Sequence, residues 1–448
     1  MKGQNFKAII VAHYPIVGIL LGSLLVTVYM GTYTNWDAQL EYEAAASVLT
    51  QGFPYISTGL MINQPPLGFY TAALFFSVSG LSYLNGIWLS TVFGLGSVFL
   101  LYVLGTVLYG KKTGLVAAAL FGIVPWHAYM TRIFLIDNQY LFLGLLFLIT
   151  GILAVRRNSQ RLVFGAGIVF AAAFLTKLYA VFMLIPMFLI IYLHKKENSF
   201  KLNFKNTFLF ILPSLVMQAV WFGGFANQHF FGVYINSDFT HPELVADPVA
   251  AFLPIIFANS AGWFLFVAGF FSLAFAVIYK KSLSGFLRLD AVCLGTIATI
   301  MGLDMLLVLG LHLTVPYVSA FKYNYTALPF FCLIAASITD KSSRLIRSIN
   351  HKKSRLIETV LVTSGLVMLF ASLVESTLFL NQWWGFASFG VDSVTYYSFN
   401  LFSEAMDRNL LVQLHFGVLM LIVLSMVLPS LFTKLKRTVE QLRIILKS

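Results

Sequence analysis

Long apolar runs, separated by short polar segments, recur along the whole chain. Each run is close to the roughly 20 residues that an α-helix needs to cross the hydrocarbon core of a bilayer. Because no water is available there to pair with backbone N–H and C=O groups, each run is expected to be a helix. The pattern therefore predicts an all-α, polytopic transmembrane bundle and excludes a soluble protein.

The composition agrees with this prediction. Hydrophobic residues make up 59% of the 448 residues and charged residues only 10%, whereas a soluble domain carries about 25% charged residues. The formal net charge is +12, but the basic residues stand in short clusters between apolar runs, which is typical of membrane topology rather than of nucleic-acid binding. Cys293 and Cys332 fall inside apolar runs and are interpreted as packing residues.

The basic clusters predict the topology, because cytoplasmic loops are enriched in Lys and Arg. Placing all the clusters inside gives about twelve spans and two cytoplasmic termini. The first run lacks the cleavage site of a signal peptide and is interpreted as a retained helix. The expected spans are residues 9–31, 84–108, 113–131, 138–155, 161–176, 178–193, 206–225, 253–279, 290–312, 324–339, 357–380 and 411–432.

The apolar stretch 66–80 does not fit as a span. It is short for a crossing, and counting it would move Lys111 and Lys112 to the outside. We expect it to form a helix on the membrane surface, within a first outer loop of residues 32–83. The whole chain, 1–448, is expected to be one domain, with further outer loops at 226–252 and 381–410 and a cytoplasmic tail at 433–448.

Few cations remain outside in this topology, and three of them stand at or beside the outer end of an expected helix: Arg132, Lys177 and Lys322. A shared anionic ligand would explain all three. A single Lys or Arg also reaches the interface by snorkelling, which is the alternative interpretation of each one taken alone. Most acidic residues lie in the outer loops as well, so the outer face is predicted to act on a lipid-borne anion.

The most informative motifs follow the first expected span. The segment contains Asn35-Trp36-Asp37, then Glu41, a Gly52-Phe53-Pro54-Tyr55 turn and Gln64-Pro65-Pro66-Leu67. It resembles the first outer loop of the GT-C glycosyltransferases that use polyprenyl-phosphate sugars, most of all the branch of protein O-mannosyltransferases and aminoarabinose transferases. In that branch an Asp opens a surface helix after the first span, and a Pro-Pro-Leu starts a second one.

Further motifs match the same family in order, over residues 9–335. They are Arg132-Ile133-Phe134-Leu135-Ile136-Asp137, which resembles a second outer acid, Leu175-Thr176-Lys177 at the end of the fifth span, and Lys322-Tyr323-Asn324-Tyr325 at the start of a late span. The chain departs from the family at Ala38, where a Glu usually follows the loop Asp. It also departs at Gln64, where the aminoarabinose branch has Lys.

The resemblance implies an integral membrane glycosyltransferase that moves a sugar from a polyprenyl-phosphate donor to an acceptor hydroxyl or amine on the extracytoplasmic side. Asp37 is then the general base that takes the proton of the acceptor. Cations stabilise the charge that develops on the departing phosphate. The candidate substrate-binding residues are Glu41, Gln64, Arg132, Asp137, Lys177, Lys322 and Tyr325. The expected partners are the lipid-linked donor, membrane lipid and an acceptor that is a protein, a glycan or a lipid.

Other interpretations stay open for single residues. Asp37 lies three residues after Thr34, as in a capping box, and could simply cap a surface helix. Asp137 also suits a helix N-terminus. Asp304 lies inside an expected span, where acids are functional candidates, but no pattern assigns it a role. The histidines expected near the outer side, which are His127, His229, His241 and His312, match no metal motif. A divalent metal is therefore the one cofactor left open, on the grounds of the resemblance alone.

Two other functions compete with a glycosyltransferase. A multi-spanning transporter of a lipid-linked or small anionic substrate would have internal repeats and broken helices at mid-membrane, and no repeat is evident in the chain. A non-catalytic assembly subunit would leave Asp37 and the outer cations dispensable.

Overall fold

The computed structural model describes residues 14–29, 36–62, 64–194, 203–225, 263–306 and 323–348, together with Gly417 and Met420. Within these ranges the chain consists of helices and turns, apart from one isolated antiparallel bridge between Tyr55 and Met61. Outside them lie Lys322, the expected loops 226–252 and 381–410, the tail 433–448, and the expected spans 357–380 and 411–432 except for Gly417 and Met420.

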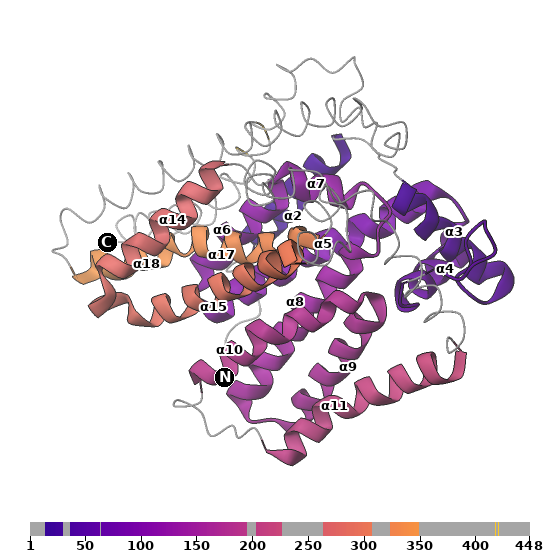
Figure 1. Cartoon of the computed structure of the whole chain (residues 1–448). Coiled ribbons are helices and arrows are strands. Elements are labelled where there is room, and N and C mark those ends of the chain that lie inside the picture. The colour runs from indigo at the N-terminus through magenta and orange to yellow at the C-terminus, as the bar shows by residue number, and fades with distance from the viewer. Residues whose placement is uncertain are drawn as a thin grey trace, which may run out of the picture.

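A bundle of apolar helices forms most of the described structure (Figure 1). Among the described residues, three helices are long and apolar enough to cross a membrane, namely α5, α8 and α15. This architecture confirms the prediction of an all-α polytopic fold. The main helices are α2 (Pro15–Tyr29), α5 (Tyr83–Leu108), α6 (Lys111–Ile123), α8 (Asp137–Arg157), α9 (Gln160–Thr176), α10 (Leu184–His194), α11 (Phe204–Gln218), α14 (Trp263–Ile278), α15 (Lys280–Met305) and α17 (Leu328–Ala336).

Several expected spans are interrupted in the structure. The expected span 113–131 is divided into α6 and the short helix α7 (Pro125–Thr131). Proline lacks the N–H that would continue α6, and it forces the preceding residue out of the helical region. Val124 accordingly has the extended dihedrals φ −61° and ψ 126°.

Other helix boundaries also differ from the expected spans. The expected span 178–193 begins as the 3-10 helix η1 (Leu178–Met183), and 206–225 ends as the π-helix η2 (Ala219–Phe225). The expected span 324–339 opens as the 3-10 helix η7 (Asn324–Ala327) before α17. Helix α15 begins at Lys280 rather than at residue 290, with a kink at Leu283.

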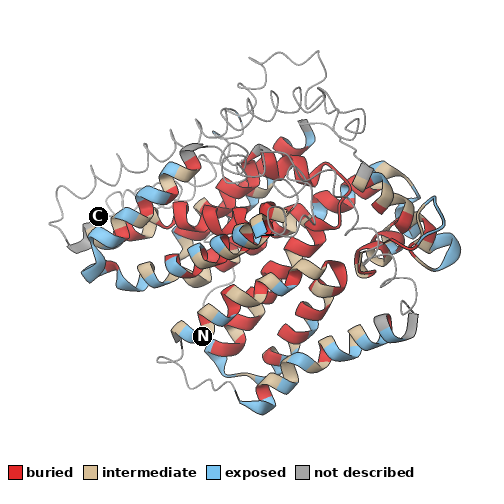
Figure 2. Cartoon of the chain, viewed as in Figure 1, coloured by how far each residue is buried: buried red, intermediate tan, exposed pale blue. Residues whose placement is uncertain are grey.

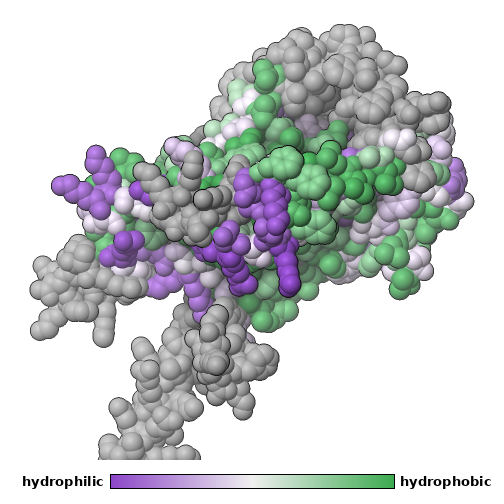
Figure 3. Space-filling view, turned by 90° about the horizontal axis from the view of Figure 1, so that it is seen from below, coloured by the Kyte–Doolittle hydropathy of each residue, from purple (hydrophilic) through white to green (hydrophobic). Residues whose placement is uncertain are grey.

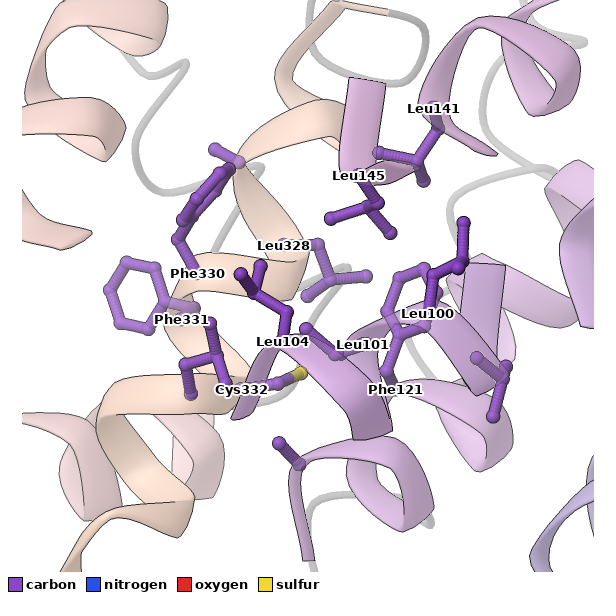
Figure 4. Packing of buried hydrophobic residues seen from close by; sticks show 14 of the residues in the cluster. Leu100, Leu101, Leu104, Phe121, Leu141, Leu145, Leu328, Phe330, Phe331 and Cys332 are labelled. Carbon is purple, nitrogen blue, oxygen red and sulfur yellow. The ribbon is translucent and has the colours of Figure 1, made fainter. Parts of the chain in front are cut away.

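The hydrophobic core lies where α5, α6, α8 and α17 meet (Figure 4). Leucines of α5 and α8 pack there against aromatic and aliphatic side chains of α6 and α17. The backbones of α5 and α6 also touch, because a Cβ added to Gly105 would lie 2.8 Å from Cα of Gly114. Such small-residue contacts are typical of helices that pack within a membrane.

The periphery of the bundle has the opposite character. Figure 2 shows buried residues concentrated on the central helices, whereas α11, α14 and α15 expose one side. Large hydrophobic side chains on that exposed side include Val267, Phe270 and Phe271 of α14. Seen from below, hydrophilic side chains gather in a few places on a largely hydrophobic face (Figure 3). A surface of this kind suits acyl chains, which are as apolar as the side chains that face them.

Two further helices, α3 (Trp36–Gln51) and α4 (Leu67–Ser79), lie together at one edge of the bundle (Figure 1). Helix α3 buries one stripe, formed by Ala38, Glu41 and Ala45, at the spacing expected of a helix face. The structure thus places residues 67–79 in a short separate helix, as expected for the stretch 66–80.

The two ends of the bundle carry different chemistry. We call the end that includes α3, α4 and the start of α8 the loop end. At the other end, called the basic end, Asp340 of α18 (Ile338–Ser348) accepts hydrogen bonds from the N–H and the hydroxyl of Thr113, at 3.0 and 2.8 Å. Lys112 donates to Ser343 there, at 3.0 Å. The first residues of α6 and those of α18 therefore meet at the basic end.

Candidate functional site at the loop end

The N-terminus of α8 is the point where α3 and α4 both meet the bundle. The carboxylate of Glu41, on α3, accepts a hydrogen bond from the N–H of Ile136 at 2.9 Å. On α4, a Cβ added to Gly68 would lie 2.5 Å from Cγ2 of Ile136, so the backbone of α4 approaches the same residue. Ile136 immediately precedes Asp137, the first residue of α8. Helices α3 and α4 are therefore held directly against the start of α8.

Glu41 occupies this position for an electrostatic reason. The first N–H groups of a helix have no partner within the helix, and the N-terminus carries a partial positive charge. A carboxylate satisfies both requirements. The side chain is only 2% exposed, so Glu41 anchors α3 to α8. Glu41 is a substrate-binding candidate by its place in the first loop, and the contact with α8 is visible only in the structure.

Asp137 forms a buried ion pair with Lys177. Nζ of Lys177 lies 2.5 Å from Oδ1 of Asp137, and both side chains are 1% exposed. Lys177 is the C-cap of α9, whose last turn lies beside the start of α8. The other carboxylate oxygen, Oδ2 of Asp137, is buried and has no hydrogen-bond partner among the described residues. Buried polar atoms are seldom left in this state, so the oxygen is a position for a ligand atom or a water.

Two tyrosines cover the lysine of this pair. The rings of Tyr179 and Tyr323 stack with centroids 4.3 Å apart and an interplanar angle of 15°. Nζ of Lys177 lies 5.2 Å from the centroid of Tyr323 and 5.9 Å from that of Tyr179. The described segment 323–348 therefore begins in contact with Lys177.

Gln139 also belongs to this region, although its role was not apparent from the sequence. Its amide Nε2 lies 3.1 Å from the hydroxyl of Thr71 on α4 and 3.4 Å from that of Thr176 on α9. One side chain therefore joins α4, α8 and α9. The only signal in the sequence was a polar residue two positions after Asp137, at the start of an apolar run.

Tyr325 lies deeper than the sequence analysis implied. Its side chain is fully buried, and its hydroxyl lies 2.5 Å from Nδ1 of His127 on α7. The two rings are nearly parallel, with an interplanar angle of 17°. Nε2 of His127 is buried and has no hydrogen-bond partner among the described residues. This pair is therefore as deeply buried as Asp137 and Lys177.

The remaining predicted residues lie around the same end. Asp37 is in the first turn of α3 and is partly exposed. It is one turn from Glu41 and so lies on nearly the same face of the helix. Gln64 is partly exposed just before α4. Arg132 is 5% exposed, with its guanidinium carbon 5.3 Å from the ring centroid of Trp88.

The turn between α3 and α4 is held in place by Tyr70. Its hydroxyl donates to the carbonyl of Gly52 at 2.6 Å, and burial raises the pKa of Tyr70, which keeps it a neutral donor. Gly52 has φ +80°, a conformation that glycine adopts readily. The ring of Trp221 on η2 meets Tyr70 edge-on at 6.1 Å.

The described residues do not contain a group of three or more His, Cys, Asp or Glu side chains that could hold a metal ion.

Comparisons with known proteins find a protein family, a relative and solved structures that this chain resembles. The family described as dolichyl-phosphate-mannose-protein mannosyltransferase matches residues 63–222. This range includes α4, the Asp137–Lys177 pair and Gln139. A protein from Bacillus subtilis (strain 168), YycA, provisionally described as a mannosyltransferase, is 25% identical over 208 residues. That match covers 44% of this chain and 30% of the length of the relative.

Solved structures show the same fold. ArnT from Cupriavidus metallidurans in the apo state is 12% identical with a TM-score of 0.55, covering 92% of this chain and 75% of that chain. ArnT bound to undecaprenyl phosphate is 14% identical with a TM-score of 0.52, covering 92% and 77%. The archaeal oligosaccharyltransferase AglB from Archaeoglobus fulgidus, in complex with an inhibitory peptide and a dolichol-phosphate, is 12% identical with a TM-score of 0.52, covering 89% and 61%.

These matches confirm that the chain is a polytopic membrane protein with the GT-C fold. They also confirm its resemblance to the O-mannosyltransferase and ArnT branch, which the motifs of the first loop predicted.

Proposed function

We propose that this chain, with its GT-C fold, is an integral membrane glycosyltransferase. It transfers a sugar from a polyprenyl-phosphate-linked donor to an acceptor hydroxyl or amine on the extracytoplasmic side. The observation that carries the proposal is the incomplete ion pair of Asp137 and Lys177, which lies where both surface helices dock. The ligands named for the solved relatives, undecaprenyl phosphate and dolichol-phosphate, support a donor of this class.

The chemistry divides between two parts of this site. The acceptor oxygen or nitrogen attacks the anomeric carbon of the sugar while the bond between that carbon and the phosphate oxygen breaks. The acceptor proton passes to Asp37, and the lipid phosphate leaves with the negative charge. Lys177 supplies a cation near the leaving group, and Oδ2 of Asp137 accepts a hydrogen bond from a substrate hydroxyl. Glu41 keeps α3, and hence Asp37, at a fixed position relative to this pair.

Asp37→Asn tests the role of Asp37 as the base. The amide keeps the shape of the side chain and some capping ability, but it accepts no proton. Transfer from a lipid-linked donor in proteoliposomes should fall by about two orders of magnitude or more, the scale of a lost general base. Glu43→Gln is the matched control, because it makes the same change on α3 at a carboxylate that bonds the N–H of Ser57 at 3.0 Å. Near-normal transfer by Asp37→Asn would leave Asp37 as a helix cap.

The same proteoliposomes separate the enzyme from a transporter. A glycosyltransferase forms a new glycosidic bond in the acceptor, which mass spectrometry detects. Movement of the intact donor or of a small anion across the bilayer, without that bond, would contradict the proposal and support the transporter.

The proposed topology places the basic end in the cytoplasm and the loop end outside. A cysteine at position 112 should react with a membrane-impermeant thiol reagent only after the cytoplasmic side is opened. Cys293 and Cys332 are buried and should give little background. Labelling of intact cells at position 112 would reverse the topology and place α3 on the cytoplasmic side.

A further inference from the structure

The intramembrane acid Asp304 has a specific partner in the structure. Its Oδ2 accepts a hydrogen bond from Nδ2 of Asn324 at 2.9 Å. Asp304 is 2% exposed and Asn324 is fully buried. Asp304 lies near the end of α15, and Asn324 is the first residue of η7. The bond therefore ties α15 to the segment that enters the bundle at the loop end.

A second polar contact joins the same two parts of the chain. Lys341, on α18, pairs with Asp290, on α15, at 2.5 Å. Along α15, Asp290 and Asp304 are about four turns apart, and along η7, α17 and α18 the partners Asn324 and Lys341 are about five turns apart. Asp290, the earlier of the two in α15, thus pairs with Lys341, late in the other segment. Asp304, the later one, pairs with Asn324, near the start of that segment. Helix α15 and the segment 323–348 therefore run antiparallel and are joined at two positions. Figure 1 shows α15 and α17 side by side.

Asn324 stands between two tyrosines of the candidate site. Tyr323 stacks on Tyr179 and lies over the ammonium group of Lys177. Tyr325 bonds to His127 through its hydroxyl. Successive residues on one turn point in different directions, so a bond at the middle residue fixes the rotation of both neighbours. Rotation of η7 about its axis would move both tyrosines off their partners at once.

We infer that Asp304 is a positioning residue of the site. Its hydrogen bond to Asn324 fixes η7 so that Tyr323 covers Lys177 and Tyr325 reaches His127. The consequence for ligand binding rests on the proposed function, because it assumes that the lipid phosphate binds beside Lys177. The geometric part, the fixing of residues 323–327, holds independently of any ligand.

Four variants isolate the hydrogen bond. Asp304→Leu and Asn324→Leu each remove one partner. Asp304→Asn keeps an oxygen acceptor and removes only the charge. The double Leu variant removes both polar groups, so it folds even where a single truncation leaves a buried group without a partner. Thr296→Val is the matched control. Thr296 is a fully buried polar residue of α15, and within the described part of the chain its hydroxyl donates to the carbonyl of Val292 on its own helix, at 2.8 Å.

Hydrogen–deuterium exchange of the ligand-free protein in detergent reads the geometric part. Exchange in the peptide that contains residues 323–327 should be at least severalfold faster in both single Leu variants and in the double variant. Asp304→Asn and Thr296→Val should match the wild type. Unchanged exchange in the Leu variants would overturn the inference, and faster exchange in Asp304→Asn would show that the charge rather than the hydrogen bond matters.

Binding of farnesyl phosphate, a short polyprenyl phosphate, reads the functional part. Each single Leu variant should bind about tenfold more weakly than the wild type, and the double variant should be no worse than either single variant, because the two residues act as one unit. The positioning role would be overturned if the double variant lost affinity by the product of the two single losses. It would also be overturned if both single variants and the double variant bound like the wild type. If the wild type itself fails to bind or to transfer sugar, the proposed function fails, and the exchange experiment still decides the geometry.

Discussion

Two buried ion pairs among the described residues have the same length but differ in how completely their hydrogen bonds are satisfied. At the basic end Lys341 and Asp290 are 2.5 Å apart and fully buried. At the loop end Lys177 and Asp137 are also 2.5 Å apart and 1% exposed. We call the first the closed pair, because all its hydrogen-bonding atoms have partners, and the second the open pair, because one carboxylate oxygen has none among the described residues.

In the closed pair every donor and acceptor has a partner. Lys341 donates to the carbonyl of Ser272 at 3.1 Å, to its hydroxyl at 2.8 Å and to Oδ2 of Asp290. Oδ1 of Asp290 accepts from the hydroxyl of Tyr109 at 3.2 Å. This pair thus joins α14, α15 and α18 to the C-cap of α5, Tyr109. All its hydrogen-bonding atoms have protein partners, so none is left for a ligand. Its role is structural.

In the open pair Oδ2 of Asp137 has no hydrogen-bond partner within the described part of the chain. A buried charge costs free energy unless its hydrogen bonds are complete. An incomplete pair is therefore expected where another molecule completes it. The two ion pairs cannot be told apart by their residue types. They differ in whether the second carboxylate oxygen accepts a hydrogen bond from the described part of the protein.

Replacing Lys341 of the closed pair should lower the free energy of unfolding more than any other change considered below. Lys341→Met leaves the charge of Asp290 buried and unpaired, so the free energy of unfolding should fall by about 3–5 kcal/mol. Thermal unfolding in detergent measures the loss. Adding Asp290→Asn should restore much of the stability, because both charges are then removed. A single variant as stable as the wild type would show that this pair does not hold the basic end together.

Ligand binding should separate the two pairs next. Undecaprenyl phosphate at about 100 times its Kd should stabilise the wild type by about 2.7 kcal/mol. The variant with both Asp290→Asn and Lys341→Met should keep this gain, whereas the variant with both Asp137→Asn and Lys177→Met should lose it. Equal gains in the two double variants, in a thermal shift titration, would remove the distinction between open and closed pairs.

Glu41→Gln should have a smaller effect on the surroundings of the open pair. The amide keeps an acceptor for the N–H of Ile136 but removes the negative charge from the N-terminus of α8, so stability should fall by about 1 kcal/mol. Hydrogen–deuterium exchange in α3 should rise as well, since α3 loses part of its anchor. Glu43→Gln, on the same helix, should do neither. A response at Glu43 as large as at Glu41 would argue against a specific anchor.

Tyr70→Phe should have the smallest effect. It removes the hydrogen bond to the carbonyl of Gly52, which lies in an exposed region, so stability should fall by about 0.5–1 kcal/mol. The open pair should be unaffected, and binding of undecaprenyl phosphate should stay within about twofold of the wild type. A tenfold loss of binding would instead place the turn at Gly52 in contact with the donor.

The sequence alone determined the class of fold and the motifs of the first loop. Apolar runs near the thickness of a bilayer are local information, and they predicted α5, α8 and α9 almost to the residue. The short length of the stretch 66–80 and the basic residues after α5 were enough to predict a separate α4. The apolar pattern did not predict breaks such as that at Val124, because hydrophobicity is continuous across Pro125. Proline interrupts the backbone hydrogen bonds of a helix without interrupting its apolar pattern.

The tertiary structure decided which charged residues meet. The sequence named Glu41, Asp137 and Lys177 as candidates but gave Glu41 no contact with α8 and left Asp304 without a role. These pairings depend on the register of helices that are far apart in the chain, and a shift of one residue turns a side chain by about 100° around its helix. Hydrophobic patterns specify that a helix is buried, whereas only the packed bundle specifies which buried oxygen has a partner and which does not.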